Sequence, residues 1–296
     1  MQSRACHRSS GVERSMSSNL FTSAMLRREL SARSRELART QKLLHDISPG
    51  SNSVVIFGRD EQGRHGNFHP ASYARICANP AWTRRLTKVH TASRRSRARK
   101  DWQWMELDSA NSSDALLMNI FCHPGVFSEG ALNSRVANLL NVDSTAQPCF
   151  GIRPGVPLRS GHLDRTEIDL QLGDLFIEAK LTETSFQNAR SRLIERYRDL
   201  ETVFDITRLP WTGDGIVQGY QLVRSVLAAF AGDASFCVFS DGRRRDLIEV
   251  WYSVLSAVHY PSFAWRLKLL TWQELAAVLP EGLQQFLDAK YGIVPD

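Results

Sequence analysis

Hydrophobic and polar positions follow two different periods after Pro148. Short runs in which every second residue is apolar predict strands, and longer runs with apolar residues three or four positions apart predict helices. The predicted strands are 166–172, 175–181, 234–240 and 263–270. The predicted helices are 185–202, 216–231, 243–258 and 272–291. Strands that alternate with helices indicate an α/β fold, in which a central mixed sheet is flanked by helices.

The chain before Pro148 has a weaker pattern. Residues 1–23 are rich in Ser and Arg, and we predict a disordered leader there; a transit peptide and an early start codon ahead of Met16 or Met25 both explain this composition. The remaining predicted elements are an amphipathic helix over 23–45, a strand over 54–57, a helix before Pro80, a helix over 108–121 capped by Ser112 or Ser113, and a helix from about Ser128. We divide the chain into a leader and helix (1–48), a region of uncertain fold (49–127) and an α/β domain (128–296).

The two strands after Thr166 are joined by Gly173-Asp174, which predicts a two-residue hairpin turn and therefore the register of the strands. Side chains alternate between the two faces of a sheet, so one face of this hairpin is predicted to be apolar and the other polar. The predicted apolar pairs are Leu172 with Leu175, Leu170 with Ile177, and Ile168 with Ala179. On the polar face, Gln171 pairs with Phe176, Asp169 with Glu178, and Glu167 with Lys180.

Asp169 and Glu178 are therefore predicted to face each other with Cβ atoms about 4.5–5.5 Å apart. Two carboxylates at this separation repel each other unless a proton or a cation lies between them, and a hard divalent cation prefers oxygen ligands. Lys180 projects from the same face, where it can orient or help deprotonate a metal-bound water and stabilise charge at phosphorus. This arrangement suits hydrolysis of phosphodiester bonds by a metal-activated water.

Asp169, followed across the hairpin by Glu178-Ala179-Lys180, resembles the active-site signature of the PD-(D/E)XK, or restriction-endonuclease-like, nuclease superfamily. The resemblance covers roughly residues 128–240, with Ile168 at the position of the Pro in the motif. It implies Asp169 and Glu178 as ligands of Mg²⁺ or Mn²⁺, Lys180 as the catalytic lysine and Glu129, on the preceding helix, as a further acidic residue. It also implies a supporting role for Gln221 on the helix after the motif.

Other interpretations of the hairpin stay open. An ordinary half-exposed antiparallel pair also has a polar face in contact with water. The triplet alone has low specificity, since Asp288-Ala289-Lys290 repeats it within a predicted helix. A catalytically inactive nucleic-acid-binding protein that keeps the fold, and a purely structural interaction domain, are the alternative functions.

The composition and the distribution of charge indicate a nucleic-acid partner. The chain has 296 residues, 43% of them hydrophobic, which is enough for a substantial core, and its apolar runs are too short to span a membrane. Residues 1–100 hold 20 Lys and Arg against 6 Asp and Glu, whereas the remainder holds 17 against 25. The densest basic run is Arg94, Arg95, Arg97, Arg99 and Lys100, followed by Trp102 and Trp104. We predict that this run contacts nucleic acid, with DNA as the expected substrate, although Arg-rich segments are also common as solvated linkers.

The five cysteines are scattered, without the spacing of metal ligands or of a redox pair. This pattern is typical of a reducing compartment, and we expect a cytoplasmic protein. The sequence leaves the oligomeric state open.

Overall fold

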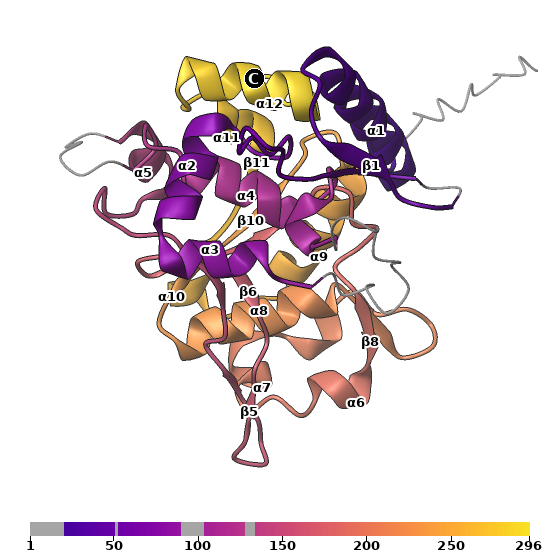
Figure 1. Cartoon of the computed structure of the whole chain (residues 1–296). Coiled ribbons are helices and arrows are strands. Elements are labelled where there is room, and N and C mark those ends of the chain that lie inside the picture. The colour runs from indigo at the N-terminus through magenta and orange to yellow at the C-terminus, as the bar shows by residue number, and fades with distance from the viewer. Residues whose placement is uncertain (1–20, 51–52, 90–103, 128–133) are drawn as a thin grey trace, which may run out of the picture.

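The computed structural model describes residues 21–50, 53–89, 104–127 and 134–296. Its centre is a five-stranded mixed sheet in the order β11-β10-β7-β6-β3. The strands are β3 (Cys149–Ile152), β6 (Ile168–Leu172), β7 (Leu175–Ala179), β10 (Ser235–Ser240) and β11 (Leu267–Thr271). β10 runs parallel to both β7 and β11, whereas β6 runs antiparallel to β7 and β3. The predicted α/β fold class, a mixed sheet flanked by helices, is confirmed (Figure 1).

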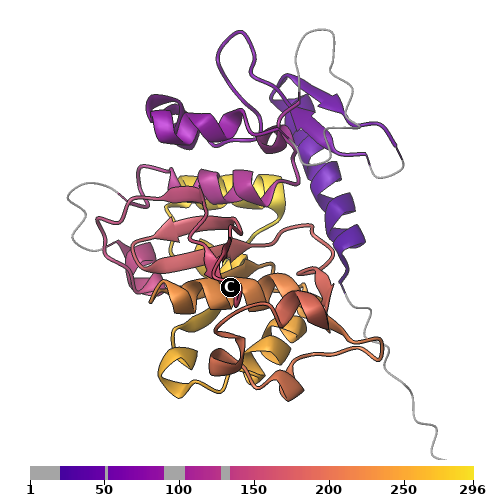
Figure 2. The ribbon, with the colours of Figure 1, turned by 90° about the horizontal axis from the view of Figure 1, so that it is seen from below.

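Helices cover both faces of the sheet (Figure 2). On one face, α8 (Tyr220–Ala231) and α9 (Arg245–Ser256) bury Val223, Val226 and Trp251 against Phe236 and Val238 of β10. On the other face lie α1 (Ser23–Thr40), α4 (Ser113–Phe121), α5 (Arg135–Leu140), α11 (Trp272–Ala276) and α12 (Glu281–Tyr291). Leu26 and Leu30 of α1 belong to this second core, so the first described helix packs with the sheet domain.

The β6–β7 hairpin has the predicted register at its closed end. Leu172 pairs with Leu175, Gln171 with Phe176 and Leu170 with Ile177. Gly173 has a φ of +58°, which a two-residue hairpin turn with glycine at its first position requires. The predicted pair of Ile168 with Ala179 is wrong: the amide of Ala179 donates instead to Oδ2 of Asp169, 2.9 Å away, and Ile168 packs in the α8 core while Ala179 packs in the α4 core.

Smaller elements of the first half lie above the α4 side of the sheet (Figure 2). A short hairpin, β1 (His45–Ile47) with β2 (Val55–Phe57), follows α1, and the strand predicted over 54–57 is confirmed. α2 (Pro70–Ala78), α3 (Pro80–Leu86) and a 3-10 turn (Glu106–Asp108) come next. Ser112 caps α4 by accepting a hydrogen bond from the amide of Ala115, as its sequence pattern predicts.

Two predicted helices are wrong over part of their length. Residues 185–202 form β8 (Asn188–Arg190) and two short helices, α6 (Ser191–Ile194) and α7 (Leu200–Val203). Residues 216–218 form β9 (Ile216–Gln218), which pairs with β8, and α8 begins only after Gly219, whose φ is +71°. A helical side-chain period is present in both segments, but pairing of the two backbones satisfies their hydrogen bonds instead.

The last part of the chain contains two further corrections. Residues 263–270 divide into α10 (Pro261–Ala264) and β11, because Pro261 starts a helical turn there. The closing helix predicted over 272–291 is two helices, since Pro280 interrupts the hydrogen-bond ladder between α11 and α12. Two short strands, β4 (Val156–Pro157) and β5 (Leu163–Asp164), and a 3-10 turn (Ile206–Arg208) complete the described elements. In the part of the chain that the structure describes, no helix has both the length and the apolar character that a membrane crossing needs.

Candidate active site

The hairpin brings Asp169, Glu178 and Lys180 together where β6 and β7 separate. Asp169 lies on β6, Glu178 on β7, and Lys180 directly after the end of β7. Nζ of Lys180 donates to Oε1 of Glu178 at 2.9 Å, and both side chains are buried. The amide of Ala179 holds the carboxylate of Asp169 in the gap between the strands. The sheet therefore presents two carboxylates and one ammonium group at a single place.

The two carboxylates affect each other electrostatically. Burial raises the pKa of Asp169 well above its usual value, and the neighbouring charges of Glu178 and Asp114 raise it further. Burial disfavours the charge on Lys180, yet the carboxylates of Glu178, Glu183 and Asp169 outweigh it and raise the pKa of Lys180. Lys180 is consequently a permanent cation near neutral pH, and the site as a whole favours an additional positive charge.

Glu178 is held through only one of its two oxygens. Oε1 accepts from Lys180 and also from Nε2 of Gln221, 2.5 Å away on α8. Oε2 is buried and, within the described residues, has no hydrogen-bond partner. A buried carboxylate oxygen without a donor is costly, which makes this atom the natural position for a cation to bind.

The segment that follows Lys180 is fixed on several sides. The backbone amide of Lys180 donates to Phe239 on β10, and its carbonyl accepts from Nε1 of Trp272. Ser23 and Arg27 of α1 both donate to the carbonyl of Thr182. The side chain of Glu183 accepts from the hydroxyl of Ser113 on α4. These bonds hold the backbone of Lys180 in place, which limits the positions open to its side chain.

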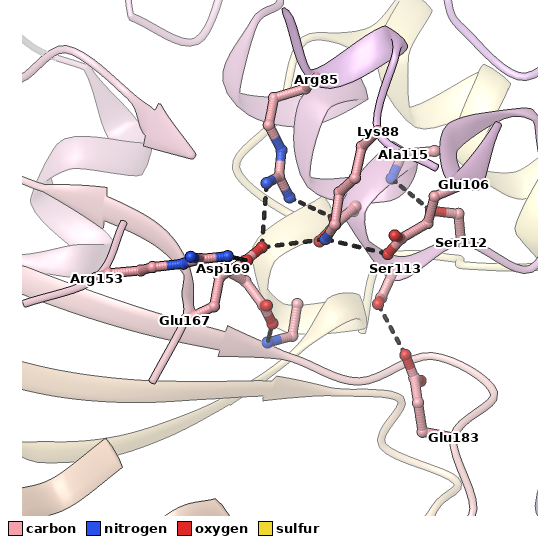
Figure 3. A network of polar contacts seen from close by, with 12 residues as sticks. Arg85, Lys88, Glu106, Ser112, Ser113, Ala115, Arg153, Glu167, Asp169 and Glu183 are labelled. Atoms are coloured by element: carbon pink, nitrogen blue, oxygen red, sulfur yellow. Dashed lines mark hydrogen bonds and ion pairs between the residues drawn. The ribbon is translucent and has the colours of Figure 1, made fainter. Parts of the chain in front are cut away.

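A second group of charges lies beside Asp169, contributed by α3, the residues after it and α4 (Figure 3). Arg85 and Lys88 share Asp114 and Glu167 between them, at distances from 2.5 to 3.1 Å. Lys88 also pairs with Glu106 at 3.2 Å, and Arg153 reaches Glu167 at 3.4 Å. Burial raises the pKa of Glu106; for Glu167, Lys88 and Arg85 overcome burial and lower the pKa.

The predicted pairing of Glu167 with Lys180 is therefore wrong. Arg85 and Lys88, about 80 positions earlier in the chain, both donate hydrogen bonds to the Glu167 carboxylate. The register of a hairpin pairs only neighbouring residues of two strands, so it cannot predict partners from so far away in the chain. Lys180 pairs with Glu178 instead, and Asp169 acts on it electrostatically.

The sequence analysis also missed Asp114. This carboxylate lies in the first turn of α4, is buried, and acts electrostatically on Asp169. Its position after the N-cap Ser112 is an ordinary helix-start pattern and contained no signal for a site. Glu129 and the basic run Arg94, Arg95, Arg97, Arg99 and Lys100 lie outside the described residues, so their predicted roles stay predictions.

The donors present suit a hard divalent cation. Asp169 and Glu178 offer carboxylate oxygens, and Oε2 of Glu178 is unsatisfied within the described residues. Among those same residues, no three His, Cys, Asp or Glu side chains form a ready metal cluster. Mg²⁺ is commonly held by one or two carboxylates and completed by water and substrate phosphate, so two protein ligands are sufficient.

Comparison with known proteins assigns the chain to a family. The family model described as Restriction Endonuclease associating with ARP matches residues 33–292, which is most of the chain. The chain belongs to this family. No curated protein and no solved structure matches it.

Membership in the Restriction Endonuclease associating with ARP family confirms the resemblance to restriction-endonuclease-like proteins. The matched region includes all of the five-stranded sheet and the residues Asp169, Glu178, Lys180 and Gln221. It also includes Asp114, Arg85 and Lys88, so the neighbouring network belongs to the family region as well. A restriction-endonuclease-like family implies a nucleic acid as the substrate.

Proposed function

We propose that the protein is a metal-dependent nuclease that hydrolyses phosphodiester bonds in DNA. The observation that supports this proposal best is the convergence of Asp169 and Glu178 on one site. There Lys180 donates a hydrogen bond to Oε1 of Glu178, while Oε2 has no partner within the described residues. An ordinary hairpin would avoid placing a buried carboxylate, Glu178, near the half-buried carboxylate of Asp169.

Each residue has a separate task in this reaction. Asp169 and Glu178 would hold the Mg²⁺ or Mn²⁺ ion, which when bound lowers the pKa of water and neutralises charge on the phosphate. The ammonium group of Lys180 stabilises the negative charge that develops on the non-bridging phosphate oxygens in the transition state. Because its pKa is raised, Lys180 stays protonated and acts as a cation and hydrogen-bond donor rather than as a general base.

Gln221 acts through Glu178. Its amide donates to Oε1 of Glu178, the oxygen that Lys180 also contacts, and so helps to fix the orientation of the carboxylate. The carbonyl oxygen of this amide is itself buried and unpaired within the described residues, which leaves it free to accept from a water or a substrate group.

The first test is cleavage of single-stranded and double-stranded DNA by the purified chain. We expect cutting with Mg²⁺ and with Mn²⁺ and none in EDTA, because two carboxylates and a lysine cannot activate water without the cation. Calorimetric titration of the protein with Mn²⁺ in the absence of DNA should show binding that is weakened by Asp169→Asn. Absence of both cutting and metal binding would reject the proposal.

A catalytically inactive nucleic-acid-binding protein is the second candidate. The observation in its favour is the closed contact of Lys180 and Gln221 with Glu178, which already neutralises part of that carboxylate. This candidate predicts that the protein retains DNA in EDTA and does not cut it under any metal condition. The same assay therefore separates the two functions.

A further inference from the structure

A groove lined by arginines lies between α1 and the start of β2, away from the carboxylates of the candidate site. Its volume is about 320 Å³. One face of α1 forms its main wall, at the three- and four-residue spacing that places side chains side by side. The lining residues from α1 are Ala24, Arg27, Arg28, Ser31, Ala32 and Arg35, and Ser53 and Val54 form the opposite wall.

The arginines of this groove differ from the other arginines of the same helix. Arg33 and Arg39 form ion pairs with Glu29 and Glu36. Within the described residues, Arg28 and Arg35 form no ion pair, and the polar contact of Arg35 there is with the hydroxyl of Ser53 at 2.9 Å. Among the described residues, the groove side of α1 therefore carries arginines without ion pairs, whereas Arg33 and Arg39 are neutralised by glutamates.

One end of the groove adjoins the backbone segment that follows Lys180. Arg27, at one end of it, donates through Nε and Nη2 to the carbonyl of Thr182, at 3.2 and 2.9 Å. Thr182 lies two residues after Lys180 in the segment that fixes the lysine backbone.

We infer that this groove binds the phosphodiester backbone of the DNA that extends beyond the scissile bond. The inference rests on the proposed nuclease function. Guanidinium groups bind phosphate oxygens through two parallel hydrogen bonds, and the small side chains of Ala24, Ser31 and Ala32 leave room between them for a phosphate. The hydroxyl of Ser31, which donates to the carbonyl of Ser53, ties the two walls together.

The test is the affinity of the full chain for a fluorescently labelled DNA duplex in EDTA, measured by anisotropy over a series of salt concentrations. The double variant Arg28→Ala/Arg35→Ala should bind roughly tenfold more weakly, and the slope of log K against log salt should fall by about 2, because two phosphate contacts are lost. The matched control is Arg39→Ala on the same helix, whose charge Glu36 already neutralises; it should bind like the unmodified chain.

A second double variant distinguishes loss of the two charges from loss of the fold. Arg28→Lys/Arg35→Lys keeps both charges, so it should retain most of the affinity and the salt slope, and thermal unfolding should show that both double variants are folded. Equal affinity and slope for Arg28→Ala/Arg35→Ala and the unmodified chain would overturn the inference.

The nuclease proposal fails separately. If no variant cuts DNA with Mg²⁺ but the alanine variant still loses affinity in EDTA, the groove stands and the catalytic assignment falls. If Mg²⁺-dependent cutting is present and the alanine variant binds normally, the catalytic assignment stands and the groove falls. Binding of an acidic protein instead of DNA, with DNA affinity unaffected by the alanine variant, also rejects the groove as a DNA site.

Discussion

Lys180→Met is expected to reduce the rate of DNA cleavage by at least about a hundredfold at saturating Mg²⁺, since one charged donor to the transition state typically contributes that much. The ammonium group lies 2.9 Å from Glu178 and is kept protonated by three nearby carboxylates. Methionine preserves the length and packing of the side chain but carries no charge. Single-turnover cleavage of labelled DNA measures the effect without interference from product release.

The same variant should also be less stable in the absence of metal. Loss of Lys180 leaves the buried carboxylate of Glu178 with Gln221 as its remaining donor within the described residues, and an uncompensated buried charge costs about 3 kcal/mol. Addition of Mg²⁺ should therefore raise the melting temperature of Lys180→Met more than that of the unmodified chain. Lys180→Arg, which retains the ion pair, should be stable in EDTA and separates loss of chemistry from loss of fold.

The chain provides its own control in the repeated triplet Asp288-Ala289-Lys290. This triplet lies at the end of α12 and has no strand partner. Lys290→Met should cleave DNA at the rate of the unmodified chain, because Lys290 contacts neither Asp169 nor Glu178. Equal cleavage by Lys180→Met and the unmodified chain would remove Lys180 from the mechanism.

The difference between the two triplets explains how much the sequence could predict. A glycine-containing turn and a strict two-residue period fix the pairing of adjacent strands, so Asp169, Glu178 and Lys180 could be assigned to one region from short-range pattern alone. Gln221 followed from its place on the helix after the motif, although that helix begins at Tyr220 and not at residue 216. Local rules hold at the closed end of the hairpin and on the amphipathic helix, but the pairs predicted at the open end, Ile168 with Ala179 and Glu167 with Lys180, do not form.

What the sequence could not predict depends on contacts between distant segments. Asp114 reaches the site from α4, Arg85 from α3 and Lys88 from just after α3, and their patterns are those of ordinary helix starts and ends. The helix predicted over 185–202 failed for the same reason, since β8 exists only through its pairing with β9. Tertiary pairing overrides local period wherever an alternative set of backbone hydrogen bonds is available.

Lys290→Met is expected to stabilise the protein by about 3 kcal/mol at pH 7. The side chain of Lys290 is fully buried, and within the described residues its Nζ has no hydrogen-bond partner. Nζ lies near the rings of Phe57 and Tyr291, 4.7 and 4.9 Å from their centroids. Two aromatic faces attract the ammonium group but do not replace its lost hydration. Methionine fills the same space without a charge to desolvate.

The difference in stability between Lys290→Met and the unmodified chain should depend on pH. Burial lowers the pKa of Lys290 to about 7, whereas an unfolded lysine titrates near 10.4. Between these values the unfolded chain binds a proton that the folded chain does not, so stability rises with pH through this window and the penalty is complete below about pH 7. Urea unfolding of both proteins from pH 6 to 10 should show that the advantage of Lys290→Met is largest at the acidic end and shrinks as pH rises. Stability curves that run parallel over this range would mean that Lys290 finds a partner or water in the folded state, and the burial argument would fail.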